Sequence, residues 1–281
     1  MTSDAVASRP RRTPKAGRDL PKAISVGIGL LVLVGASLAF RPEPFVLLAT
    51  AAVGAALWEL KQAFLRRDIH LPLLPLLVGA AGILISSYYS GPEALMVSFV
   101  LTVAGVVVWR VIDGSGTAAV RDAAAGTFAT AYLPFMAGFV MMMLANPDNG
   151  RIQVLLFILL AVSNDVGGYV AGVLFGRHPL APSISPKKSW EGLAGSFVLA
   201  TAIGVVGAVY GLGVSPVIGV LLGIMVPLTA TVGDLAESMI KRDLELKDMG
   251  SLLPGHGGVL DRLDSMLLTA PFVYLLLSVS L

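Results

Sequence analysis

Nine apolar segments, each long enough to cross a lipid bilayer, follow one another along this 281-residue chain. A helix needs roughly 20 mostly apolar residues to span the hydrocarbon core of a membrane. The segments are continuous rather than alternating in polarity, and backbone groups in lipid must be bonded internally, so helices are favoured over barrel strands. We place the spans at 23–40, 44–60, 72–89, 92–110, 123–145, 152–175, 191–210, 214–238 and 263–281.

Composition supports the same class. Charged residues make up only 14% of the chain and its mean hydropathy is +0.82, whereas soluble domains average about 25% charged residues. The chain has no cysteine, which excludes thiol catalysis, disulfides and zinc–thiolate sites. We therefore predict an all-α, polytopic integral membrane protein.

The basic residues predict its orientation. A cytoplasmic amino terminus and nine spans put every Lys and Arg on the cytoplasmic side except Arg41 and Arg151. Cytoplasmic loops of membrane proteins carry an excess of basic residues. We therefore expect a multi-pass protein of the cytoplasmic (inner) membrane whose longer, functional loops face the cytosol.

Three regions follow from this pattern. Residues 1–22 are basic and poor in apolar side chains, so we expect a disordered cytoplasmic tail. Residues 23–145 would form a helical scaffold, with room for a lipid cavity. Residues 146–281 would form the catalytic region, with cytoplasmic loops at 176–190 and 239–262.

The end of the eighth span carries the first candidate site. If this segment is helical, Asp234, Glu237, Ser238 and Lys241 lie on one face, because they are spaced by three and four residues. Acidic side chains beside an apolar run are costly unless paired or metal-bound, so a functional role is the first hypothesis. The alternative is a solvated helix end with an ordinary Glu237–Lys241 pair.

A glycine-rich turn precedes the last span. Gly257 and Gly258 follow His256 and would let the backbone approach an anion closely. Asp261 and Asp264 lie one helical turn apart, and two carboxylates beside a phosphate-binding turn suit Mg²⁺. The alternative is that the two aspartates only stabilise the start of a helix, where the helix dipole favours negatively charged side chains.

The sixth span and the loop after it form a second candidate site. Asp165 lies within an apolar run, where a buried carboxylate needs a partner. The loop contains Ser185, Lys187 and Lys188, which suit either anionic lipid headgroups or a nucleoside triphosphate. Charged residues at other span ends are explained by topology and snorkelling; they are Glu59, Arg110, Asp113, Arg121 and Asp122.

The segment 238–264 closely resembles the signature of the phosphatidate cytidylyltransferases, also called CDP-diacylglycerol synthases. The matching residues are Ser238, Lys241, Arg242, Lys247, Asp248, Gly250, Leu253, Pro254, His256, Gly257, Gly258, Asp261, Arg262 and Asp264. Asp165, Tyr169 and the loop ISPKKSWEG also resemble this family, so the resemblance covers about 150–281. Val166 and Ser189 depart from it, since a small hydroxyl residue and Thr are frequent there.

The resemblance implies an enzyme that converts CTP and phosphatidate to CDP-diacylglycerol and pyrophosphate and that requires Mg²⁺. It also suggests a second cation and a homodimer. It implies catalytic roles for Asp234, Lys241, Asp261 and Asp264, with the three aspartates as metal ligands. The implied substrate-binding residues are Asp165, Ser185, Lys187, Lys188, Ser238, Arg242, His256, Gly257, Gly258 and Arg262.

Two other functions stay open. A related membrane nucleotidyl- or phosphotransferase with another lipid or polyprenol acceptor would share the metal site. An ion-coupled transporter would use Asp165 and Asp234 as a relay through the bundle. Nothing in the sequence suggests a nucleic-acid partner.

Overall fold

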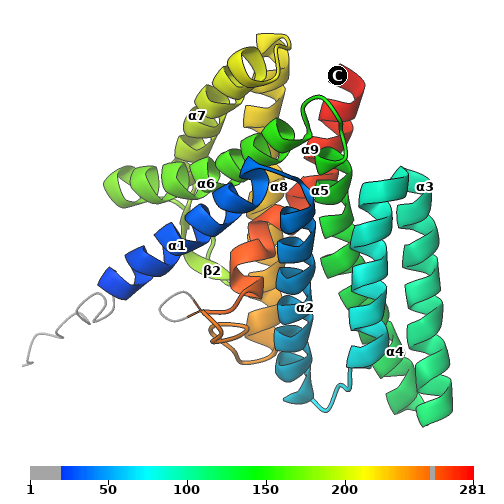
Figure 1. The fold of residues 1–281 in the computed structure, drawn as a ribbon. Coiled ribbons are helices and arrows are strands. Elements are labelled where there is room, and N and C mark those ends of the chain that lie inside the picture. Colours follow the sequence, from blue (N-terminus) through cyan, green and yellow to red (C-terminus); the bar gives the residue numbers. More distant parts are fainter. Residues whose placement is uncertain (1–19, 115, 254–256) are drawn as a thin grey trace, which may run out of the picture.

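The structure, a computed structural model, describes residues 20–114, 116–253 and 257–281 and is almost entirely helical (Figure 1). Its elements are α1 (Leu20–Ala39), α2 (Glu43–Leu65), α3 (Leu73–Asp113), α4 (Thr117–Thr130), the π-helical turn η1 (Ala131–Phe135), α5 (Met136–Leu144), α6 (Gly150–Phe175), β1 (Pro179–Ala181), β2 (Ser185–Ser189), α7 (Trp190–Val206), the π-helical turn η2 (Gly207–Gly211), α8 (Pro216–Asp243) and α9 (Leu260–Ser280). The all-α prediction is confirmed. Within the described residues, the one sheet is an antiparallel hairpin of β1 and β2.

In the part of the chain that the structure describes, seven helices are long and apolar enough to cross a membrane. One of them, α3, contains two arms, because Gly91 adopts φ 74° and ψ −156° and Pro92 follows it. The arms run antiparallel, and Ser86 Oγ donates to Ser98 Oγ at 3.0 Å. These arms match the predicted spans 72–89 and 92–110. The total of nine spans and the cytoplasmic amino terminus stay predictions, and residues 1–19 of the predicted tail lie outside the described residues.

Two helices extend beyond their apolar segments. The helix formed by α4, η1 and α5 begins at Thr117, six residues before the expected span. Helix α8 continues to Asp243, past the expected end at 238. Hydropathy marks the part of a helix that lipid contacts, whereas polar helical turns outside it carry no such signal. As a result, Lys241 and Arg242 lie on α8 rather than in a loop.

Helices α6, α7 and α8 pack closely through small residues, as is common between membrane helices. A Cβ atom added to Gly167 would lie 2.6 Å from the Gly195 carbonyl oxygen, and one added to Gly223 would lie 2.3 Å from Thr201 Cα. Gly168 also lies close to α7, because a Cβ atom added to it would lie 2.8 Å from Ser196 Oγ. This subgroup therefore depends on direct contact between helix backbones.

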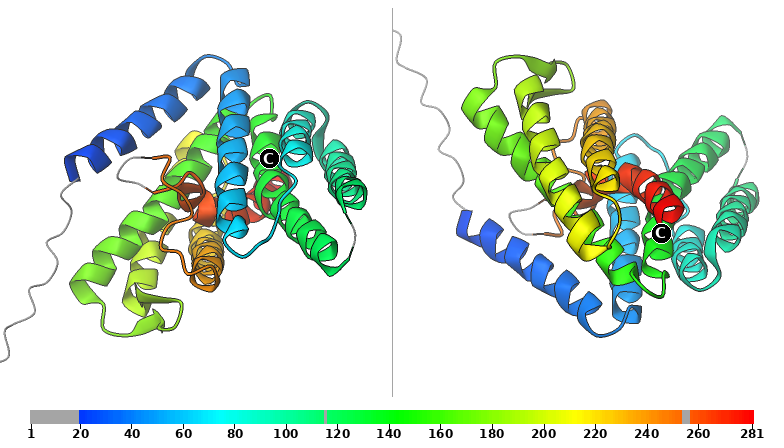
Figure 2. Two further views of the ribbon diagram at one scale, coloured as in Figure 1. Left: turned by 90° about the horizontal axis from the view of Figure 1, so that it is seen from below. Right: turned by 90° about the horizontal axis from the view of Figure 1, so that it is seen from above.

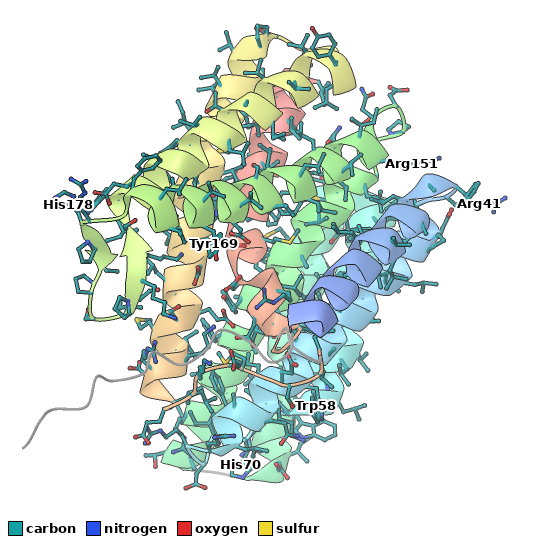
Figure 3. The ribbon with its side chains drawn as sticks, turned by 90° about the vertical axis from the view of Figure 1, so that its left-hand side faces the viewer. Arg41, Trp58, His70, Arg151, Tyr169 and His178 are labelled. Carbon is teal, nitrogen blue, oxygen red and sulfur yellow. The ribbon has the colours of Figure 1, made fainter. Side chains whose placement is uncertain are left out.

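Helices α8 and α9 lie between α6 and α7 on one side and the group formed by α2, α3, α4 and α5 on the other (Figure 1). Thr229 Oγ1 of α8 donates to Thr269 Oγ1 of α9 at 3.1 Å. Helix α1 runs along the outside of the bundle (Figure 2). Arg41 and Arg151, the two basic residues expected outside, lie near each other on one side of the molecule, and His70 lies at its lower end (Figure 3).

Candidate active site

The end of α8 is joined to the start of α9 by one ammonium group. Lys241 Nζ lies 3.0 Å from Glu237 Oε2 and 3.0 Å from Asp261 Oδ1. The Glu237 side chain is 0% exposed, so the alternative of a solvated helix end does not apply to it. A buried carboxylate is tolerated when it is paired and hydrogen-bonded. This arrangement therefore stabilises both helix ends and buries three charged groups together.

Asp261 also organises the loop between the two helices. Its Oδ2 accepts the backbone N–H of Gly258 at 2.8 Å and that of Met249 at 3.0 Å. Gly257 has φ +83°, a conformation that side chains other than glycine rarely adopt. The described parts of this loop, 244–253 and 257–259, are thus both held by the Asp261 carboxylate. His256, which was predicted to shape this turn, lies outside the described residues.

Glu59 is a member of this site that sequence reasoning missed, because it was assigned to an ordinary span end. It lies on α2 and is 0% exposed, and its Oε2 accepts the N–H of Leu260 at the start of α9, at 2.9 Å. A Cβ atom added to Gly258 would lie 2.5 Å from Glu59 Oε2, and one added to Gly250 would lie 2.1 Å from Oε1. The two glycines therefore make room for this carboxyl group. The available signal was an acidic residue between Leu57 and Leu60, six positions before the end of α2 at Leu65.

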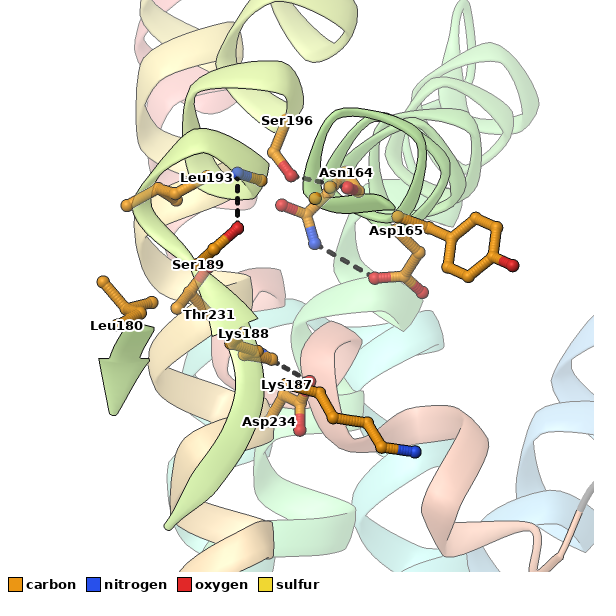
Figure 4. Close-up of a pocket in the computed structure, with 14 residues that line it drawn as sticks. Asn164, Asp165, Leu180, Lys187, Lys188, Ser189, Leu193, Ser196, Thr231 and Asp234 are labelled. Atoms are coloured by element: carbon orange, nitrogen blue, oxygen red, sulfur yellow. Dashed lines mark hydrogen bonds and ion pairs between the residues drawn. The ribbon is translucent and has the colours of Figure 1, made fainter. Parts of the chain in front are cut away.

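A polar cavity of about 250 Å³ adjoins the end of α8 (Figure 4). Its walls come from α6, the β1–β2 hairpin, α7 and α8, and the polar residues that line it are Asn164, Asp165, Tyr169, Lys187, Lys188, Ser189, Ser196, Thr231 and Asp234. Lys188 Nζ forms an ion pair with the Asp234 carboxylate. The two candidate sites of the sequence analysis therefore meet in one cavity.

Local interactions hold this wall in place. Ser189 caps α7 by accepting the N–H of Gly192 at 3.1 Å, so the Ser that replaces the more frequent Thr keeps the needed hydroxyl. Asp165 is exposed on the cavity wall rather than buried, and Asn164 Nδ2 donates to its Oδ1 at 3.0 Å. Asn164 is thus a polar neighbour of Asp165, a role that the apolar side chain of Val166 on the other side cannot fill. The start of α7 adds a dipole that favours anions near Lys188.

Comparison with known proteins identifies the family. A model described as the cytidylyltransferase family matches residues 21–280. The chain belongs to the cytidylyltransferase family. It is 37% identical over 289 residues to the phosphatidate cytidylyltransferase of Mycobacterium leprae (strain TN), covering 98% of this chain and 92% of that protein. It is also 37% identical over 278 residues to the protein of the same name from Mycobacterium tuberculosis (strain ATCC 25618 / H37Rv), covering 95% of this chain and 84% of that protein.

A shorter match, 42% identical over 134 residues, joins the chain to the phosphatidate cytidylyltransferase of Synechocystis sp. (strain ATCC 27184 / PCC 6803 / Kazusa), and covers 46% of this chain and 45% of that protein. Together these findings confirm the resemblance and the prediction of a nucleotidyltransferase enzyme. They are consistent with the long apolar helices of a multi-pass membrane protein.

The predicted metal ligands of this cytidylyltransferase-family chain are each engaged with protein groups. Asp234 accepts from Ser238 Oγ at 3.2 Å and pairs with Lys188, and Asp261 pairs with Lys241. Asp264 adjoins Glu237, whose Oε1 is buried without a hydrogen-bond partner. In the part of the chain that the structure describes, no three His, Asp or Glu side chains converge on one point. The donors are nevertheless hard oxygens with an unsatisfied buried atom, which fits Mg²⁺.

The other predicted substrate-binding residues lie at different places. Lys187 lines the polar cavity and is exposed. Ser185 begins β2, and Arg242 Nε donates to the carbonyl oxygen of its neighbour Ile184 at 3.4 Å, so both lie at the outer edge of the hairpin. Arg262 does not line the polar cavity; it lines a separate apolar one. Of the predicted substrate-binding residues, the polar cavity is lined by Asp165, Lys187 and Lys188.

The role of Glu59 gives a prediction. Replacement by Leu would remove the acceptor of the Leu260 N–H, and a buried unsatisfied donor costs roughly 1–3 kcal/mol. We expect the loop 244–259 to open about tenfold more often in Glu59→Leu, since ~1.4 kcal/mol is a tenfold change in an equilibrium constant. Limited trypsin digestion, followed by mass spectrometry of cleavage after the exposed Lys247, measures this opening.

The matched control is Glu59→Gln, which retains a side-chain carbonyl oxygen. It should be cleaved at a rate close to that of the wild type. Equal cleavage rates for the Leu variant, the Gln variant and the wild type would mean that Glu59 does not hold this loop.

Proposed function

We propose that this protein is a phosphatidate cytidylyltransferase that converts CTP and phosphatidate to CDP-diacylglycerol and pyrophosphate. The observation that carries the proposal is the polar cavity with Lys187 and Lys188 on its wall, next to the buried network of Lys241, Glu237 and Asp261. A triphosphate needs basic side chains at an accessible site, and the lipid needs that site at the end of apolar helices. The names of the mycobacterial relatives support the same substrates.

The reaction requires no strong general base. An anionic oxygen of the phosphatidate phosphate attacks the α-phosphorus of CTP. The bond from that phosphorus to the oxygen bridging the α- and β-phosphates breaks, and pyrophosphate leaves with the electron pair. Two anions must approach each other, so neutralising their charge and aligning the attack are the main requirements.

The side chains at the cavity suit these requirements. Lys187 and Lys188 would bind CTP phosphates, with Lys188 exchanging its contact with Asp234 for a phosphate oxygen. Lys241 would keep Glu237 and Asp261 in place while the charge on the substrates shifts. Asn164 and Asp165 would face the part of the nucleotide that lies deeper in the cavity.

A magnesium ion fits beside this cavity. Asp234, Asp261 and Asp264 would hold it, while Lys241 stays paired with Glu237 and Asp261. When bound, the ion would neutralise phosphate charge and polarise the α-phosphate of CTP. The second cation, the homodimer and the position of the site at the cytosolic face of the inner membrane are parts of the same proposal.

The geometry favours this function over ion transport. A relay through the membrane needs ionisable groups at successive depths. Asp165 and Asp234 instead line one cavity, and Lys188 pairs with Asp234 (Figure 4). A transferase that uses another lipid phosphate would share this cavity, so the acceptor has to be tested directly.

The test uses purified protein in liposomes with Mg²⁺, phosphatidate and CTP labelled at either the α- or the γ-phosphate. We expect the α label in the extracted lipid and the γ label in pyrophosphate, with loss of both after chelation of the metal. ATP and GTP serve as nucleotide controls, and a polyprenyl phosphate serves as the acceptor control. Transfer to the polyprenyl phosphate alone, or no transfer from CTP by folded protein, would contradict the proposal.

Lys188 provides a second prediction. Lys188→Ala removes a charge-assisted contact with a CTP phosphate, which is worth roughly 1.5–3 kcal/mol. The apparent KM for CTP should therefore rise by about tenfold or more, and the KM for phosphatidate should change less. Steady-state kinetics with each substrate varied in turn measures this. Lys61→Ala, at the end of α2 and away from the cavity, is the matched control. Unchanged kinetics in Lys188→Ala would assign the lysine to lipid headgroups instead.

A further inference from the structure

One polar group on the wall of the polar cavity has no task in the proposed reaction. Asn164 is 7% exposed, and its Oδ1 is buried and accepts no hydrogen bond from any residue that the structure describes. Its Nδ2 donates to Asp165 Oδ1 at 3.0 Å, which orients the amide group. A buried acceptor without a donor is costly. A ligand that brings an N–H group to this atom would recover that free energy.

The neighbouring polar atoms on this side of the cavity are acceptors as well. Ser196 Oγ donates its proton to the backbone carbonyl oxygen of Asn164 at 2.6 Å, so this proton is already in use. The Asp165 carboxylate is exposed on the cavity wall, and the bond from Asn164 goes to its Oδ1, which leaves the lone pairs of Oδ2 for a ligand. Asn164 Oδ1 and Asp165 Oδ2 are therefore two acceptors on adjacent residues, and they suit a ligand with two donors.

The two ends of the cavity match the two ends of a nucleotide. Figure 4 shows Lys187 and Lys188 in the lower part of the cavity and Asn164 and Asp165 in the upper part. The volume of about 250 Å³ is below the roughly 300–1,000 Å³ of a cavity that encloses a whole drug-sized ligand, so one part of a nucleotide fits here. If the lysines bind phosphates, the base is the part that reaches the acceptors, and Leu193 offers apolar contact to its ring.

The pyrimidine bases differ at the atom that such acceptors would meet. Cytosine carries an exocyclic amino group with two N–H donors, whereas the carbonyl oxygen at the same ring position of uracil is an acceptor. A carboxylate accepts well from the amino group of cytosine. Uracil would place its oxygen against two further acceptors and leave all three without a donor, which is unfavourable in a buried site.

We propose that Asp165 and Asn164 bind the exocyclic amino group of cytosine, with Asp165 Oδ2 and Asn164 Oδ1 as the two acceptors, and that this pair selects CTP over UTP. The inference rests on the proposed function and deepens it, because it names the atoms that recognise the base. It assigns Asp165 to nucleotide specificity rather than to the metal. Asn164 has a second task, since it also orients the Asp165 carboxylate.

Binding to the wild-type protein tests the inference without turnover. The probes are CTP, UTP and a CTP analogue that carries hydrogen in place of the amino group, each titrated calorimetrically with Mg²⁺ into protein in phosphatidylcholine nanodiscs. We expect UTP and the analogue to bind about 10–100-fold more weakly than CTP, the factor typical of losing a hydrogen bond to a charged group. Equal binding of CTP and the analogue would overturn the inference. No binding of CTP at all would contradict the proposed function itself.

Asp165→Asn tests the assignment to this residue. The amide keeps the size of the carboxylate but replaces one acceptor by an N–H donor, which can bind the carbonyl oxygen of uracil. We expect the ratio of kcat/KM for CTP to that for UTP to fall about tenfold or more, while the KM for phosphatidate stays within about twofold. A purely structural role would lower kcat/KM for both nucleotides equally, and that result, or an unchanged ratio, would overturn the inference.

The matched control is Asp148→Asn, the same exchange at an exposed position in the turn before α6. It should keep the wild-type ratio of kcat/KM for the two nucleotides. A fall in this ratio as large as that in Asp165→Asn would likewise count against the assignment.

Cross-linking of the wild type keeps the inference testable if Asp165→Asn does not fold. The probe 5-azido-CTP carries its photoreactive group on the ring carbon next to the one that bears the amino group. We expect labelled peptides from α6 around Asn164 and from α7 around Ser196, with excess CTP reducing the labelling more than excess UTP. Labelling confined to the β1–β2 hairpin or to other helices would place the base elsewhere and overturn the inference.

Discussion

The ammonium group of Lys241, shared by Glu237 and Asp261, is the interaction on which the rest of the site depends. Burying these charges is costly, and removing one partner of a buried pair leaves an uncompensated charge. The shared contact fixes the end of α8 against the start of α9. Asp261 in turn fixes the loop, because it accepts hydrogen bonds from the N–H groups of Met249 and Gly258. The backbone at Met249 and at Gly258 is thereby fixed at the edge of an apolar bundle.

Two cavities of opposite chemistry border this pair of helices. One is polar and built by α6, the β1–β2 hairpin, α7 and α8, and the other is apolar and built mainly by α1, α2, α5 and α9. A reaction between a soluble nucleotide and a membrane lipid needs both environments near one point. The membership of the cytidylyltransferase family and the geometry thus support one account.

Much of this could be predicted from the sequence because the signals are local. The spacing of Asp234, Glu237 and Lys241 places them on one helix face, and the apolar lengths predict the helices. Contacts between distant segments were not predictable: Glu59 binds an N–H group 201 positions away, so it resembled an ordinary charged helix end. Asp261 and Arg262 are adjacent, yet neighbours on a helix point in different directions, and the two residues serve different surroundings. The boundaries of α4 and α8 also differed, since polar helical turns lack a hydropathy signal.

The most direct test of the central claim is a thermal double-mutant cycle on purified protein with Lys241→Met, Asp261→Asn and the double variant. Breaking a buried ion pair costs about 3–5 kcal/mol, so Lys241→Met should lower the unfolding midpoint by roughly 10 °C, given ~2–4 °C per kcal/mol for a chain of this size. If Lys241 and Asp261 act as one unit, the double variant should lose several degrees less than the sum of the single losses. Losses that add within error would show that the two helix ends are held independently, and would contradict the account.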